Sequence, residues 1–124
     1  MIEIYCGKVI HGNKKGKGFG FPTVNIFLDD YMQLTDSGVF ATEITVEKVV
    51  YKGMLYIGTR PTLILNQLSV EINIFDFNND IYGERVCFKI LQKIRPDIAF
   101  ESIDLLIKQI HADKLEIENF FAHR

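Results

Sequence analysis

The sequence predicts an α+β domain in which five or six antiparallel strands, arranged as a barrel or a sandwich, precede a helix. Two observations predict it. Up to about residue 91, apolar residues recur in short runs separated by turn residues, and from Ile103 onward they follow a helical period. A chain of 124 residues suits one domain with one hydrophobic core, and no linker or repeat divides it.

The expected strands follow one another with short connections. Their ranges are 2–10, 23–28, 39–46, 49–57, 69–77 and 81–91. In the third of them Phe40 and Ile44 share one face of the strand, whereas Glu43 points to the other. The turn signal Asn-Asn-Asp at 78–80 predicts that the last two strands form a hairpin.

The C-terminal helix is predicted from a single apolar stripe. Its members are Ile103, Leu106, Ile107 and Ile110. Ser102 is expected to cap the helix N-terminus, and Asp104 favours the positive end of the helix dipole. Asp113 and Glu116 have the spacing of an acidic capping box, which predicts that the helix breaks near His111 and restarts.

Composition excludes several classes of protein. A net charge of −2 argues against a nucleic-acid module that depends on phosphate neutralisation. Neither a signal peptide nor an apolar stretch of membrane length is seen, so we expect a cytoplasmic protein that does not bind membranes.

Cys6 and Cys87 lie far apart in apolar, strand-like runs, which predicts buried, reduced thiols. The three histidines are scattered and form no ligand cluster.

The segment 16–25 carries the strongest functional signal and reads GKGFGFPTVN. Its glycines allow backbone N–H groups to approach an anion closely. Thr23 and Asn25 would share one face of the following strand and offer two hard oxygen ligands. Four lysines and no acidic residue lie between Lys8 and Lys17, which suits a small anionic ligand. The segment therefore predicts a site for nucleotide phosphates and Mg²⁺.

The two common phosphate-binding motifs do not fit this segment. A Walker A loop requires Ser or Thr after its lysine, whereas Lys17 is followed by Gly18. A dinucleotide fingerprint opens a helix, whereas this segment enters a strand through Pro22.

Three further segments are weak signals when taken alone. Residues 58–62 read as an ordinary turn. Glu71 lies on the strand face opposite Val70 and Ile72, so it is either a solvated glutamate or, if that face borders a cleft, a general base near an apolar wall formed by Phe75 and Phe77. The aromatic residues and arginine of 76–83 and 94–100 belong either to the core and surface of a hairpin or to a site for a planar ligand.

Taken in order, these segments resemble the riboflavin kinase family, the flavokinase module of bacterial bifunctional FMN- and FAD-forming enzymes and of eukaryotic monofunctional kinases. The resemblance runs from Gly7 to about Asp113, and residues 16–25 correspond to the family's Gly-Arg-x-x-Gly-Phe-Pro-Thr-Ala-Asn. Three positions depart from the family pattern. Lys17 replaces the usual arginine, Tyr56 a frequent asparagine, and Asn73 a frequent histidine.

The resemblance implies a mainly β fold, a closed six-stranded antiparallel Greek-key barrel with the C-terminal helix packed outside. It implies transfer of the ATP γ-phosphoryl group to the 5′-hydroxyl of riboflavin, giving FMN and ADP. Glu71 would be the base, Thr23 and Asn25 would bind Mg²⁺ (or Zn²⁺ or Mn²⁺), and Arg95, Phe100 and Tyr82 would border the flavin. The implied ATP-binding residues are Gly16, Lys17, Gly18, Gly20, Phe21, Pro22, Thr23 and Asn25.

We therefore expect residues 1–124 to be one riboflavin kinase domain, acting as a monomer without the adenylyltransferase domain that precedes it in bacterial relatives. Two other classes of protein fit the sequence less well. A non-catalytic flavin- or nucleotide-binding regulatory module would have no use for a base together with a metal-binding pair. A small barrel for single-stranded nucleic acid would need a basic stripe with interleaved aromatic residues, which the sequence lacks.

Overall fold

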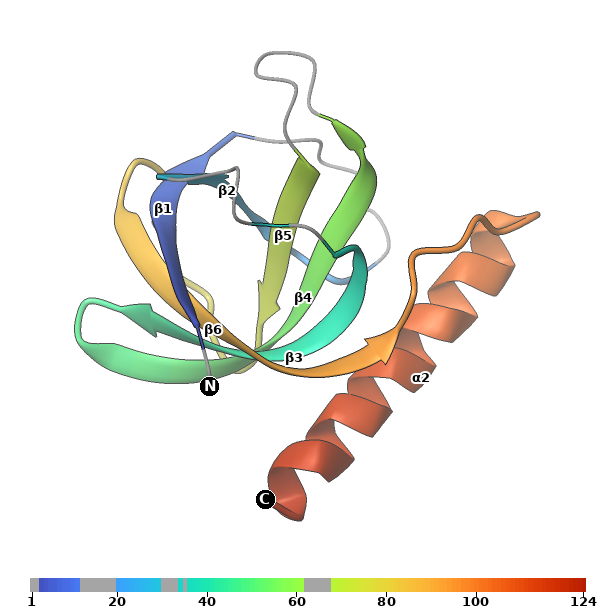
Figure 1. Ribbon diagram of the computed structural model, residues 1–124. Helices are drawn as coiled ribbons and strands as arrows, with labels where there is room; N and C mark the ends of the chain where they lie inside the picture. Colours follow the sequence, from blue (N-terminus) through green and yellow to red (C-terminus); the bar gives the residue numbers. More distant parts are fainter. Residues whose placement is uncertain (1–2, 12–19, 30–33, 35, 62–67) are drawn as a thin grey trace.

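The computed structural model describes residues 3–11, 20–29, 34, 36–61 and 68–124, with the backbone alone for 59–61. Six antiparallel strands close a barrel in the order β1-β2-β5-β4-β3-β6, and one helix, α2, lies outside it (Figure 1). The elements are β1 Ile4–Ile10, β2 Val24–Leu28, β3 Gly38–Val46, β4 Val49–Pro61, β5 Leu68–Ile74, β6 Arg85–Arg95 and α2 Ile103–Ala122. The predicted barrel with its C-terminal helix is thus confirmed.

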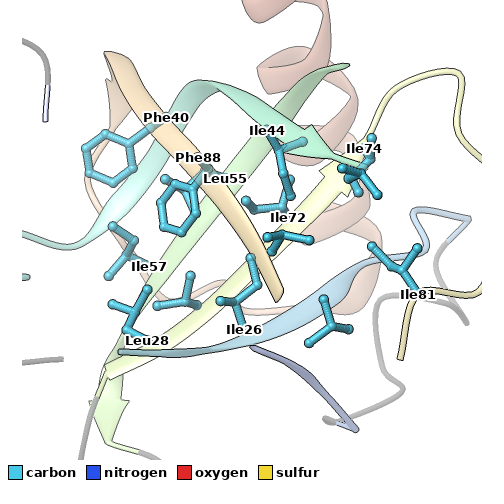
Figure 2. Packing of buried hydrophobic residues seen from close by; sticks show 14 residues of the cluster. Ile26, Leu28, Phe40, Ile44, Leu55, Ile57, Ile72, Ile74, Ile81 and Phe88 are labelled. Carbon is cyan, nitrogen blue, oxygen red and sulfur yellow. The ribbon is translucent and has the colours of Figure 1, made fainter. Parts of the chain in front are cut away.

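The barrel interior is filled by the apolar half of each alternating strand. In β3, Phe40 and Ile44 point inward and are fully buried, as their spacing predicts. Figure 2 shows them meeting Leu55 from β4, Ile72 from β5 and Phe88 from β6. Because these side chains occupy the interior, a ligand can bind only on the outside of the wall or at the barrel ends.

A second group of buried apolar residues lies between the barrel wall and α2. Its members are Phe21, Val39, Ala41, Met54 and Ile117. Strands β3 and β4 contribute outward-facing residues to this group, and α2 contacts β3, β4 and β6. These strands are therefore buried on both faces, and their outer face supports the helix.

Helix α2 begins as predicted but does not break. Ser102 is its N-cap and accepts a hydrogen bond from the Leu105 backbone N–H at 3.2 Å. The expected break near His111 is wrong, because α2 is continuous from Ile103 to Ala122. Asp113 does not cap a new helix: its side chain is 1% exposed and accepts two hydrogen bonds from Arg95 Nε, at 2.9 and 3.0 Å. An acidic residue more than two turns from either end of the helix cannot act as a cap once it has this partner.

The hairpin expected across residues 78–80 is also wrong. Strand β5 pairs with β2 and β4, whereas β6 pairs with β1 and β3. Residues 75–84 form a longer connection that is bound to β1 by the Gly83 N–H to Val9 C=O and Val9 N–H to Glu84 C=O hydrogen bonds, both 2.9 Å. The turn expected at 58–62 differs as well, since the backbone of 58–61 continues β4.

The prediction of two reduced, buried thiols is wrong. Cys6 on β1 and Cys87 on β6 are register partners, and a disulfide joins them. Both residues are half-buried at the seam where the first and last strands close the barrel. Sequence distance concealed this contact, because closure brings together residues separated by 81 positions.

The buried Arg95–Asp113 ion pair makes the attachment of α2 sensitive to a single substitution. We expect Asp113→Ala to lower the free energy of unfolding by about 3 kcal/mol, because it leaves a largely buried guanidinium without its carboxylate. Urea unfolding followed by circular dichroism measures the change. Asp36→Ala is the matched control, since it removes only the exposed ion pair with Lys93 and should cost much less stability. Equal losses in both variants would contradict this account.

Candidate functional site

A cavity of about 610 Å³ lies between the outer face of the barrel and the helix side of the molecule. Strands β3, β4 and β5 form its floor, and the connection 96–102 with the first half of α2 forms its roof. It is lined by Phe21, Thr23, Val39, Met54, Tyr56, Glu71, Asn73, Arg95, Asp97, Ile98, Phe100, Glu101, Ser102, Ile103, Leu106, Ile110 and Asp113. This space is called the first cavity.

The alternation of β5 places Glu71 in the first cavity. Val70 and Ile72 point into the barrel and are buried there, so Glu71 and Asn73 point outward beneath the roof. Glu71 therefore borders a cleft, as one of its two readings requires, and its role as a base stays a prediction. Phe75 packs in the group of apolar residues under α2 and does not line the first cavity. Phe77 does not join it and packs against the barrel interior instead.

The Glu71 carboxylate is held by two hydroxyl groups. Thr23 Oγ1 donates to Glu71 Oε1 at 3.1 Å, and Ser69 Oγ donates to Glu71 Oε2 at 3.5 Å. Burial raises the pKa of Glu71 above its ordinary value, and the two hydrogen bonds offset part of that rise. A carboxylate with a raised pKa is a better proton acceptor, and this one stands at the edge of a cavity.

A second cavity, of about 490 Å³, lies at the other side of Thr23. It is lined by the end of β1, the start of β2 and the connection that follows β5, including His11, Pro22, Thr23, Asn25, Phe77 and Tyr82. The rings of His11 and Tyr82 stack there, with centroids 3.7 Å apart and planes at 13°. Thr23 lines both cavities, so the two spaces meet at its side chain.

The chain around Thr23 is fixed by the neighbouring strands. Asn25 is the register partner of Glu71 across the β2–β5 pair. The Asn73 side chain, 7% exposed, donates to the Pro22 carbonyl oxygen at 2.7 Å and holds the segment before β2. The structure thus brings together Thr23, Asn25 and Glu71, which the sequence predicted as metal-binding residues and base.

The other predicted residues divide between the two cavities. Arg95 and Phe100 lie together on the roof of the first, with the guanidinium carbon 5.4 Å from the ring centroid. Tyr82, expected beside them, lines the second cavity instead.

The predicted phosphate loop is described only at its end. Gly16, Lys17 and Gly18 lie outside the described residues. Gly20 has a φ of 82°, which favours glycine, and lies outside the lining of both cavities. Phe21 packs under α2 and lines the first cavity, whereas Pro22 lines the second.

Sequence reasoning missed four residues of these cavities as site residues: Tyr56, Asp97, Asp113 and His11. Tyr56 is the register partner of Glu71 across β4–β5 and so lies beside it on the floor. The period-2 pattern of β4 assigns Tyr56 to the outer face, but only the strand pairing places it next to Glu71. Asp97 and Asp113 carry no sequence signal of a site residue, because their positions depend on the path of the chain after β6.

Comparisons with known proteins agree with this arrangement. The family model described as riboflavin kinase (flavokinase) matches residues 4–121. The bifunctional riboflavin kinase/FMN adenylyltransferase of Bacillus subtilis is 38% identical over 120 residues, which cover 94% of this chain and 38% of the relative. The crystal structure of riboflavin kinase from Trypanosoma brucei aligns with a TM-score of 0.69 at 25% identity, covering 98% of this chain and 80% of that one.

A third comparison is a crystal structure from Streptococcus pneumoniae described as a macrolide-efflux protein. It aligns with a TM-score of 0.85 at 36% identity, over 94% of this chain and 38% of that one. The chain thus spans little more than a third of the length of its bifunctional relatives, at 38% and 37% for those of Bacillus subtilis and Listeria monocytogenes. Within the described residues, no helix has the length and apolarity needed to cross a membrane.

The burial of Glu71 predicts a pH-dependent gain in stability when its charge is removed. A pKa raised in the folded state means that the ionised carboxylate destabilises the fold, so wild-type stability falls as pH rises from the ordinary value of 4.5 through the raised pKa. Glu71→Gln keeps an acceptor for the Thr23 hydroxyl and should not lose stability as the pH rises through this range. We expect its melting temperature to exceed that of wild type at neutral pH, with the difference vanishing below pH ~4.5. A variant less stable than wild type at neutral pH would contradict this, and exposed Glu118→Gln serves as the control.

Proposed function

The chain belongs to the riboflavin kinase family, and on this basis we propose that it transfers the γ-phosphoryl group of ATP to the 5′-hydroxyl of riboflavin, giving FMN and ADP. The observation that carries the proposal is the position of Thr23. This residue lines both cavities, and its hydroxyl donates a hydrogen bond to Glu71. A phosphoryl transfer needs two substrate sites that meet at the reacting atoms with a base beside them.

We assign riboflavin to the first cavity. Its volume of about 610 Å³ falls in the range of about 300–1,000 Å³ that is usual for such ligands. Val39 and Met54 on the floor and Phe100 on the roof offer two apolar surfaces for the flat ring system. The polyhydroxyl chain would then extend toward Glu71 and Thr23, where the polar groups of the cavity lie.

We assign ATP to the second cavity, with its phosphates toward Thr23. The stacked rings of His11 and Tyr82 offer an aromatic surface on which a purine base can extend the stack. In the sequence, the glycines and lysines of segment 12–19 lie between His11 and Pro22, two residues that line this cavity.

In the reaction, the riboflavin 5′-oxygen attacks the γ-phosphorus while the bond from that phosphorus to the β,γ-bridging oxygen breaks. The hydroxyl proton passes to the Glu71 carboxylate, and ADP leaves with the bridging oxygen. The hydrogen bond from Thr23 holds Glu71 Oε1, so the carboxylate is oriented before the substrate arrives. The raised pKa of Glu71 suits it to accept this proton.

The donors present fit a magnesium ion delivered with the nucleotide. The Thr23 hydroxyl and the Asn25 carboxamide are hard oxygen ligands on neighbouring positions. Among the described residues, no group of three His, Cys, Asp or Glu side chains could hold a metal ion alone. When bound, Mg²⁺ neutralises phosphate charge, and the same donor set would accept Mn²⁺ or Zn²⁺.

We further propose that the protein acts as a cytoplasmic monomer that does not bind nucleic acid. Residues of a single chain line both cavities, which supports action without a partner. The net charge of −2 opposes binding to a polyanion. Size-exclusion chromatography at assay concentration tests the monomer.

The kinase proposal is tested by incubating the purified protein with riboflavin, ATP and Mg²⁺ and measuring FMN by chromatography. We expect Glu71→Gln to lower kcat by about 10²–10⁴-fold while riboflavin still binds, because only the proton acceptor is lost. Exposed Glu118→Gln is the control and should match wild type. Absence of FMN with wild type would refute the kinase, and an unchanged rate in Glu71→Gln would refute the base alone.

The assignment of the nucleotide cavity is tested at Tyr82. We expect Tyr82→Ala to raise KM for ATP on the order of tenfold, since one base–aromatic stack is worth about 1–3 kcal/mol. The KM for riboflavin should stay within twofold of wild type, and Tyr82→Phe should retain the wild-type KM for ATP. If Tyr82→Ala instead raised KM for riboflavin, the tyrosine would belong to the flavin site.

A further inference from the structure

A side chain of the barrel floor contacts the roof of the first cavity. Tyr56, on β4, donates its hydroxyl to Asp97, with 3.1 Å to each carboxylate oxygen. Tyr56 belongs to the floor and Asp97 to the connection 96–102, which forms part of the roof. This hydrogen bond links strand β4 to that connection.

Further contacts of the connection come from the end of β6. In the described part of the chain, residues 96–101 make no backbone hydrogen bond to the barrel. Arg95, the last residue of β6, donates from Nη1 to the Pro96 carbonyl at 3.1 Å, and its guanidinium lies over Phe100. These contacts hold the connection to β6, whereas the Tyr56–Asp97 hydrogen bond, called the Tyr56 tie below, links it to the floor strand β4.

Gly58 makes room for this tyrosine. It lies two residues after Tyr56 on β4 and so faces the same side of the strand. A Cβ added at Gly58 would lie 3.1 Å from Tyr56 Cε2, 3.2 Å from its hydroxyl oxygen and 3.3 Å from Ser69 Cβ. The phenol ring thus lies next to the position that a side chain at residue 58 would occupy. This gives a reason for glycine at a position that the sequence alone marks only as part of a turn.

The hydroxyl remains a donor over the whole neutral range. Burial, together with the negative charge of Asp97, raises the pKa of Tyr56 to about 12. Because the phenol stays protonated near neutral pH, it keeps donating its hydrogen bond to Asp97.

We propose that Tyr56 is a positioning residue for riboflavin: through Asp97 it holds the connection 96–102 over the first cavity at the height that the flavin ring requires. Residues Ile98 and Phe100 of the connection line the cavity opposite Val39 and Met54. If the roof is fixed on folding, the ligand need not order it on binding. The tie therefore acts on the affinity for riboflavin and leaves the chemistry at Glu71 and Thr23 unchanged. This inference rests on the proposed function.

The experiment compares Tyr56→Phe with wild type by riboflavin fluorescence quenching without nucleotide, and by FMN formation. The variant keeps the ring in the apolar group under α2 and removes only the hydroxyl. We expect the riboflavin Kd and KM to rise about tenfold, equivalent to about 1.4 kcal/mol, with kcat within twofold of wild type. Tyr5→Phe is the matched control, because Tyr5 also donates to a carboxylate, that of Glu3, at 2.5 Å, and lines neither cavity.

Two further variants test the route through Asp97 and Gly58. Asp97→Ala should weaken riboflavin binding, and the double variant with Tyr56→Phe should be no weaker than Asp97→Ala alone, since both remove the same tie. Gly58→Ala should weaken binding as well, because its methyl group displaces the phenol. Melting temperatures within a few degrees of wild type for Tyr56→Phe show that the fold is retained.

The outcomes separate the two proposals. Wild-type protein that neither binds riboflavin nor forms FMN would overturn the proposed function. Active wild type with an unchanged riboflavin Kd in Tyr56→Phe would overturn the positioning role alone. A lower kcat with unchanged Kd would also overturn it, because Tyr56 would then act in the chemical step. Additive losses in the double variant would show that Tyr56 does not act through Asp97.

Discussion

The buried ion pair between Arg95 and Asp113 is the interaction on which the functional side of the molecule depends. It joins the end of β6 to the middle of α2, and Gln109 adds a 2.8 Å hydrogen bond to the same carboxylate. Charged groups taken out of water need this degree of pairing. Because the pair fixes α2 nearly three turns away from its N-terminus, the first turns of the helix stand clear of the wall. The first cavity is the space that this leaves, and Leu106 and Ile110 line it.

Much of the fold could be predicted because it depends on local patterns. Alternation in β3 and β5 gives the inward and outward faces, and Ser102 marks where α2 begins. What failed depends on which strands pair. The expected hairpin of the last two strands was wrong because closing the barrel sets β6 beside β1 and β3. The same closure joins Cys6 to Cys87, and the chain path after β6 supplies the partner of Asp113. None of these contacts can be recognised from a pattern among residues close to them in the sequence.

The candidate site likewise divides into residues that local patterns predict and residues that only strand pairing or the chain path places there. Thr23, Asn25 and Glu71 were predictable because each lies in a motif whose strand face is set by residue spacing, and β2–β5 pairing then brings them together. Tyr82 carries an equally recognisable motif position, but the connection 75–84 turns toward β1 and takes it to the second cavity. Tyr56 lacks such a motif. Its place in the site comes from being opposite Glu71 in the β4–β5 register, together with the space left by Gly58.

The distribution of charge explains why the two substrates would occupy different cavities. The first cavity carries the carboxylates of Glu71, Asp97, Glu101 and Asp113 against one guanidinium, that of Arg95, which Asp113 already pairs. A nucleoside triphosphate placed there would meet uncompensated negative charge in a partly buried space, whereas the neutral flavin would not. Among the described residues, Asp80 is the one acidic residue that lines the second cavity. Repulsion would therefore direct the polyphosphate away from the first cavity, and its terminal phosphate would approach Glu71 at Thr23, where neutral hydroxyl and carboxamide groups separate the two charges.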